Sequence, residues 1–157
     1  MTHHNFFCRS IVRSIVLSIV LSISLSVINL LFSLAAHAEI VVVGHPSAPV
    51  LTKSEAEQIF LGKTRLFPNK TAVKPFDLPE TEQIYQHFYQ KLANKTPLVL
   101  RAYWSRMIFT GSGEPPKTVE DADELKQMIT EDPRVLGYLE REDVDESVKI
   151  LLSFSKE

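Results

Sequence analysis

The side chains that could carry out chemistry are few and scattered along the chain. His45 and His87 lack the spacing of a pair of metal ligands, and Gly111-Ser112-Gly113 lacks the strand-to-helix setting of a nucleophile elbow. The one cysteine, Cys8, lies in an N-terminal segment that we expect to be removed. We therefore predict that the chain is not an enzyme and binds no metal and no cofactor.

The stretch 77–81, Asp-Leu-Pro-Glu-Thr, places carboxylates and a hydroxyl just before a predicted helix. A helix N-terminus can bind an anion through its free N–H groups. Asp77, Glu80 and Glu82 can equally serve as the partners of that helix dipole, which would leave no vacancy for an anion. An anion site therefore needs a positive side chain folded back over the loop. The candidates are Lys74, Arg101 and Arg106.

Two predicted strands precede this stretch. The run 39–43, EIVVV, is unbroken and β-branched, which indicates a strand buried on both faces. The loop 44–49, which contains Ser47, follows that strand. Residues 71–76 predict the second strand and lead directly into Asp77.

The stretch 51–62, LTKSEAEQIFLG, has the start and stop signals of a complete short helix. Thr52 and Glu55 form a capping box, in which each side chain satisfies a backbone N–H of the first turn. Gly62 can take the left-handed conformation that ends a helix. Further along, residues 98–109 are apolar around most of a predicted helix, so we place this helix in the middle of the domain.

Strands separated by helices, rather than by hairpins, indicate an α/β fold, a three-layer sandwich with a mainly parallel sheet. The last two predicted strands are 135–139 and 147–152. Sheets of this kind bind ligands beyond the carboxyl ends of their strands. The corresponding loops are 44–49, 77–81 and 110–114.

The first 38 residues predict a cleaved signal peptide. Arg9 and Arg13 precede an apolar run without charge, and Ala36-His37-Ala38 has the small-x-small form of a cleavage site, so we expect cleavage after Ala38. Residues 39–157 then form one domain without a lipid or membrane anchor, and we expect it to be periplasmic. Of the 17 Lys and Arg, 15 remain against 19 Asp and Glu, a formal charge of −4. That net charge does not indicate a basic surface for binding nucleic acid.

Three stretches together resemble the phosphate-binding component of ABC transporters, within the type 2 periplasmic-binding protein superfamily. They are the run from Val41 through LTKSEAEQIFLGK, the pair Tyr103-Trp104 and the closing DPRVLGYL. The resemblance covers nearly all of residues 39–157. It implies the fold of one lobe, whereas a full binding protein has two lobes that close on the ligand.

In that family the phosphate loop has the pattern R-x-D-x-S-G-T. Asp77 and Thr81 keep their places in it, but the arginine, the serine and the glycine are lost. The resemblance implies a ligand site for phosphate or another small oxyanion, for which we name Ser47, Asp77, Thr81 and Arg101. It also implies partners, namely an ABC permease or another envelope protein, or a second copy as a homodimer. The alternative is a ligand-free interaction module of the same fold that binds a periplasmic or envelope partner protein.

Overall fold

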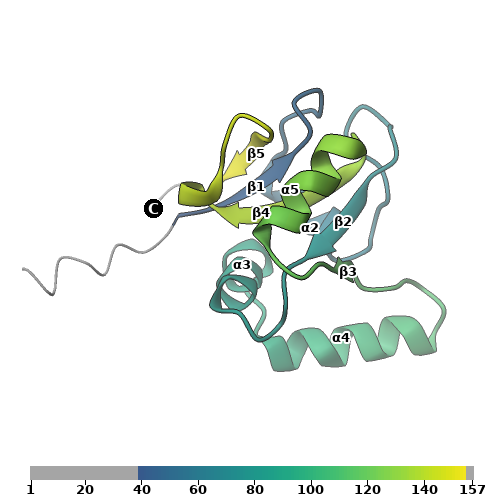
Figure 1. Cartoon of the computed structure of the whole chain (residues 1–157). Coiled ribbons are helices and arrows are strands. Elements are labelled where there is room, and N and C mark those ends of the chain that lie inside the picture. The colour runs from purple at the N-terminus through teal and green to yellow at the C-terminus, as the bar shows by residue number, and fades with distance from the viewer. Residues whose placement is uncertain (1–38, 155–157) are drawn as a thin grey trace, which may run out of the picture. The chain divides into compact units, whose positions relative to one another are not determined.

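The computed structural model describes residues 39–154, so the predicted signal peptide lies outside the described residues. Five strands form one sheet in the spatial order β3-β2-β4-β1-β5 (Figure 1). The strands are β1 (Ile40–Gly44), β2 (Lys74–Asp77), β3 (Lys117–Thr118), β4 (Val135–Glu140) and β5 (Lys149–Ser153). The helices are α2 (Lys53–Phe60), α3 (Gln83–Ala93), α4 (Pro97–Phe109) and α5 (Ala122–Glu131), with a short 3₁₀ turn, η1, at Arg141–Asp143.

The sheet is mainly parallel, as the alternation of strands and helices predicts. β2 pairs in parallel with both β3 and β4, whereas β1 pairs antiparallel with β4 and with β5. Four strands therefore run in one direction and β1 opposes them. All five residues of β1 are buried, in agreement with its unbroken apolar sequence.

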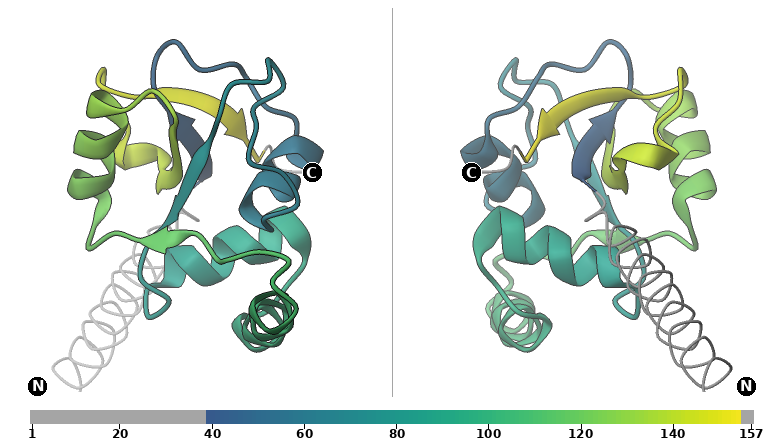
Figure 2. Two further views of the ribbon diagram at one scale, coloured as in Figure 1. Left: turned by 90° about the vertical axis from the view of Figure 1, so that its right-hand side faces the viewer. Right: turned by 90° about the vertical axis from the view of Figure 1, so that its left-hand side faces the viewer.

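Helices cover both faces of the sheet, which makes the fold a three-layer sandwich (Figure 2). Successive residues of a strand point to opposite faces, and Gly137 and Tyr138 of β4 show both packings. A Cβ on Gly137 would lie 2.5 Å from Cδ2 of Leu125, so α5 sits directly on that face. On the other face the Tyr138 ring stacks on Phe88 of α3 at 3.7 Å and meets the edge of Phe60 of α2 at 5.9 Å.

Helix α2 begins and ends where its sequence signals predict. The Thr52 backbone N–H donates to Glu55 Oε2 at 2.8 Å, and the Thr52 hydroxyl accepts from the Glu55 N–H, so the capping box is formed. Gly62 has a φ of 69°. The Gly62 N–H donates to Ile59 and the Lys63 N–H to Gln58, which is the Schellman pattern of a helix end.

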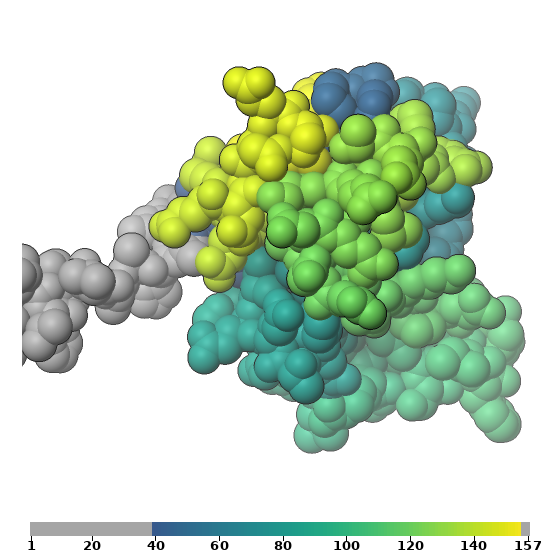
Figure 3. Space-filling model, in the orientation of Figure 1, coloured from purple at the N-terminus to yellow at the C-terminus, as the bar shows by residue number. Residues whose placement is uncertain are grey.

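The predicted position of α4 in the middle of the domain is wrong. The helix lies along the lower margin of the domain, and its side chains form that edge in the space-filling view (Figure 3). Leu100 and Trp104 alone are buried among its residues, whereas Leu98 is 70% exposed and Phe109 is 91% exposed. Apolar residues all round a helix do not say which of its faces meets protein. Across residues 39–154, no helix has both the length and the apolar character needed to cross a bilayer.

Candidate functional site

A cleft of about 340 Å³ lies past the carboxyl ends of β2 and β3. Asp77 and Thr118 are the last residues of these two parallel strands and are paired in register, so both reach the same edge of the sheet. Helix α4 forms the facing wall. The lining residues are Asp77, Glu80, Tyr85, Arg101, Trp104, Ser105, Ile108, Pro115, Pro116 and Thr118.

Asp77 is the one charged residue that is buried in the part of the chain that the structure describes. The Tyr89 hydroxyl lies 3.0 and 2.9 Å from its two carboxyl oxygens. Burial raises the pKa of Asp77 to about 8, although the hydrogen bonds from Tyr89 and Tyr138 act in the opposite direction. At neutral pH this carboxyl is therefore protonated and can donate a hydrogen bond as well as accept one.

Helix α4 turns four side chains toward the cleft because their spacing of i, i+3, i+4 and i+7 lies on one helical face. They are Arg101, Trp104, Ser105 and Ile108. The Arg101 guanidinium forms an ion pair with Glu80, and both side chains are well exposed. An exposed ion pair contributes about 0–1 kcal/mol, so Arg101 can exchange Glu80 for a bound anion at little cost.

Trp104 supplies a donor without a partner. Its side chain is 6% exposed, and its indole Nε1 is buried with no hydrogen-bond partner in residues 39–154. An unsatisfied buried donor costs about 1–3 kcal/mol. The benzo edge of the indole packs at Gly62, where an added Cβ would lie 3.1 Å from Cη2. The contact with Gly62 thereby fixes the benzo ring of the indole. Nε1 belongs to the five-membered ring of the same side chain, which lines the cleft.

The structure brings together two of the four residues named from the sequence. Asp77 and Arg101 line the same cleft, and Arg101 is the one of the three candidate cations that lines it. Thr81 is exposed in the turn before α3 and does not line the cleft. Asp77 bonds to Tyr89, so the carboxyl is engaged by a phenol rather than serving as the helix cap.

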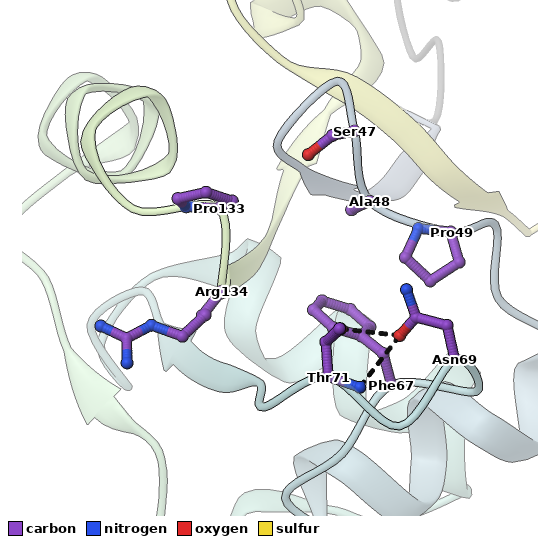
Figure 4. Close-up of a pocket in the computed structure, with 8 residues that line it drawn as sticks. All are labelled: Ser47, Ala48, Pro49, Phe67, Asn69, Thr71, Pro133 and Arg134. Carbon is purple, nitrogen blue, oxygen red and sulfur yellow. Dashed lines mark hydrogen bonds between the residues drawn. The ribbon is translucent and has the colours of Figure 1, made fainter.

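Ser47 lines a separate pocket of about 250 Å³, between the loop after β1 and the loop before β2 (Figure 4). Its hydroxyl lies 2.8 Å from His45 Nδ1. Asn69 accepts from the Thr71 N–H and hydroxyl, and Arg134 donates twice to Asp132 at 2.8 Å. Each of these polar side chains already has a protein partner within or beside the pocket, so the pocket makes a weaker ligand site than the cleft.

Trp104, Ser105 and Thr118 are among the lining residues that the sequence analysis did not name as ligand residues. Trp104 has the core position that its apolar neighbours indicate, yet it also lines the cleft. The sequence signal that could have identified Trp104 and Ser105 is their spacing from Arg101, which places residues 101, 104, 105 and 108 on one face of the helix. No group of three His, Cys, Asp or Glu within residues 39–154 is arranged to hold a metal ion.

Solved structures with the same fold are binding proteins of phosphate transport. An ABC-type phosphate transport receptor from Vibrio cholerae matches with a TM-score of 0.57 at 14% identity, over 72% of this chain and 45% of that one. A protein described as a phosphate ABC transporter substrate-binding protein from Clostridium perfringens, solved with bound phosphate, matches with a TM-score of 0.56 at 16% identity, over 72% and 44%. PstS from Borrelia burgdorferi matches with a TM-score of 0.54 at 12% identity, over 72% and 46%.

The chain has the α/β fold of part of each of these solved proteins. The fold expected from the sequence resemblance is thereby confirmed. The chain spans less than half the length of these solved proteins. No family model and no curated protein matches the sequence.

Proposed function

We propose that this chain is an exported, periplasmic solute-binding-like protein whose cleft takes a small oxyanion such as phosphate. The observation that carries the proposal is the unpartnered, buried N–H of Trp104, on a helix that also brings Arg101 to the cleft. Both groups are hydrogen-bond donors and neither can accept, so together they favour an acceptor-rich ligand. The likeness in fold to phosphate-binding proteins supports the same class of ligand.

Each polar group of the cleft has a role in this proposal. Arg101 leaves Glu80 and binds two oxygens of the anion through its planar guanidinium. Trp104 donates to a third oxygen and gains the partner it lacks. The neutral Asp77 adds no negative charge at the inner wall, and its carboxyl can donate to an oxygen or accept the proton of a protonated phosphate. The hydroxyl of Thr118, at the end of β3, completes the set.

Segment 1–38 acts in this proposal as the signal peptide, with cleavage after Ala38. The released domain, residues 39–157, works in the periplasm with an ABC permease or another envelope protein. A single lobe encloses a ligand less completely than a good pocket does, so the affinity depends on Arg101 and Trp104 more than on enclosure.

The single tryptophan of the chain makes the test direct. Phosphate is titrated into the protein while Trp104 emission is followed, with sulfate and chloride at equal ionic strength as controls. We expect a saturable change in emission with phosphate and none with chloride. Thermal unfolding supplies an independent readout, because a ligand at 100 times its dissociation constant adds about 2.7 kcal/mol of stability. Unchanged emission and an unchanged melting temperature with every oxyanion would refute the proposal.

The second candidate function is a ligand-free interaction module for a periplasmic or envelope partner protein. The observation that favours it is the exposed apolar surface of α4, where Leu98 and Phe109 face solvent. The two functions differ in the effect of Arg101→Gln, which abolishes anion binding but leaves a contact through Phe109 intact.

A further inference from the structure

An exposed face of α4, which overlaps at Ser105 with the face that lines the cleft, carries a stripe of four residues whose sizes run large, small, small, large in either direction. The stripe has steps of four, three and four residues, which is the spacing of a helix–helix seam. Its members are Leu98, Ala102, Ser105 and Phe109. All four are exposed. The stripe has a large apolar side chain at each end and small side chains between them.

From this pattern we infer that α4 is a self-association surface on which two copies of the chain pair through antiparallel α4 helices. A two-fold axis between Ala102 and Ser105 sets Leu98 of one copy against Phe109 of the other, and Ala102 against Ser105. Helices that cross at an angle approach most closely at the crossing point and diverge toward their ends. The small residues therefore lie where the backbones must come together, and the large ones lie where the space widens.

The flanks of the stripe fit the same arrangement electrostatically. In the antiparallel register Arg101 lies opposite Ile108 of the second copy, and Arg106 lies opposite Val99. No like charges oppose each other directly, and the aliphatic stems of both arginines can cover apolar side chains. Ile108 and Val99 are 56% and 49% exposed, so both are available to that contact.

The area available suits a weak dimer. Phe109, at 91% exposure, offers on the order of 200 Å². With Leu98, Val99 and Ile108 the apolar patch reaches about 400 Å² per copy, within the range of functional patches on monomers. The apolar patches of both copies, together with the arginine stems and the small residues, bury about 1,000 Å² in the pair. This total area is at the lower end for a specific interface. We therefore expect a dissociation constant in the micromolar range.

This inference rests on α4 alone and stands whether or not the cleft binds an oxyanion. It does place the second copy beside the cleft, because Ser105 of the seam and Arg101 and Ile108 of one flank also line the cleft. A second copy would thus supply cover that a single lobe lacks.

Sedimentation equilibrium of the full chain, up to about 1 mM, where even weak pairs associate, tests the inference. We expect the wild type to dimerise and Phe109→Glu to dimerise at least ten-fold more weakly, because the change sets a carboxylate in an apolar seam. Val50→Glu is the matched control, since Val50 is 67% exposed and lies outside α4; it should dimerise like the wild type. A wild type that stays monomeric would overturn the inference, even if it binds a foreign protein. Equal dimerisation of the wild type and both variants would also overturn it.

Cross-linking tests the register separately. In chains with Cys8→Ser, the single variants Leu98→Cys and Phe109→Cys are mixed and treated with a short bismaleimide. Position 98 faces position 109 across an antiparallel seam, whereas two copies of position 98 lie about 16 Å apart along the helix axis. We expect cross-linked pairs that contain one chain of each variant. Equal cross-linking within either variant alone would overturn the antiparallel register.

Discussion

The Tyr89 hydroxyl lies within 3.0 Å of both carboxyl oxygens of Asp77, and both side chains are buried. The Tyr138 hydroxyl accepts from the Leu78 N–H at 3.2 Å, directly after Asp77 in the chain. Two phenols from α3 and β4 thus fix the end of β2, where the cleft begins. Burial favours the neutral form of the Asp77 carboxyl and outweighs the hydrogen bonds from the phenols, which favour the ionised form, and this has consequences for stability and for binding.

The stability of the domain should fall as the pH rises from 5 to 8. The folded-state pKa of Asp77 is raised to about 8, against 3.8 for the free side chain, so in this window the folded chain holds a proton that the unfolded chain has released. Stability from this proton is complete below pH 4 and is lost as the pH rises through 8. The expected loss is on the order of 3 kcal/mol between pH 5 and 8, measured by urea unfolding.

Asp77→Asn is the control for that pH dependence. The amide keeps an acceptor for Tyr89 but cannot titrate, so its unfolding free energy should stay nearly flat between pH 5 and 8. Asp145, whose pKa the Ser147 hydroxyl lowers to about 2, loses its contribution only in acid and does not interfere. If the wild type and the variant have the same slope, Asp77 is already ionised when folded.

Arg101→Gln should abolish phosphate binding, and Arg106→Gln should leave it unchanged. The two arginines lie five positions apart on α4, but only Arg101 lines the cleft. Loss of a charge-assisted, two-pronged contact should weaken binding by more than ten-fold. Isothermal titration calorimetry with phosphate, at fixed ionic strength, measures both variants. An equal loss in the two would indicate general electrostatic attraction rather than a site.

The ends of the helices were predictable from the sequence, whereas the cleft was not. The capping box of Thr52 and Glu55 and the glycine end at Gly62 act within a few residues, so local sequence contains the whole signal. The cleft joins Asp77 to Arg101 and to Thr118, which come together only because β2 and β3 are parallel neighbours and α4 crosses their ends. The pairing of β2 with β3 and the position of α4 across their ends cannot be inferred from a single sequence.

The error over α4 has a physical origin as well. Its inner face needs only Leu100 and Trp104 to pack on the domain, and its other apolar residues lie outside. A helix that packs on a core through one face and on a partner through another has the same composition as a helix buried within one domain. The apolar composition of α4 therefore does not predict how much of the helix is buried within its own domain.

Trp104→Phe should weaken phosphate binding about ten-fold and change the unfolding free energy less than a core truncation would. Phenylalanine keeps most of the ring that packs at Gly62 but removes the N–H that has no protein partner. Removing an unsatisfied donor relieves its desolvation cost and offsets part of the lost packing. Calorimetry gives the affinity and urea unfolding gives the stability. A large loss of stability with unchanged affinity would make Trp104 a core residue alone.

Gly62→Ala should destabilise the domain more than Gly111→Ala. The two glycines are matched, since each follows the last turn of a helix, with φ of 69° and 64°, and each donates to the carbonyl three residues back. An alanine in this conformation costs about 1–2 kcal/mol at either position. At Gly62 the new Cβ would also lie 3.1 Å from Trp104 Cη2, whereas at Gly111 it meets no atom within 4 Å. Urea unfolding should therefore show an excess loss at Gly62, and Trp104 emission should shift in that variant alone. Equal losses with unchanged emission in both would mean that the indole moves aside freely, which would remove the fixed position on which its role in the cleft depends.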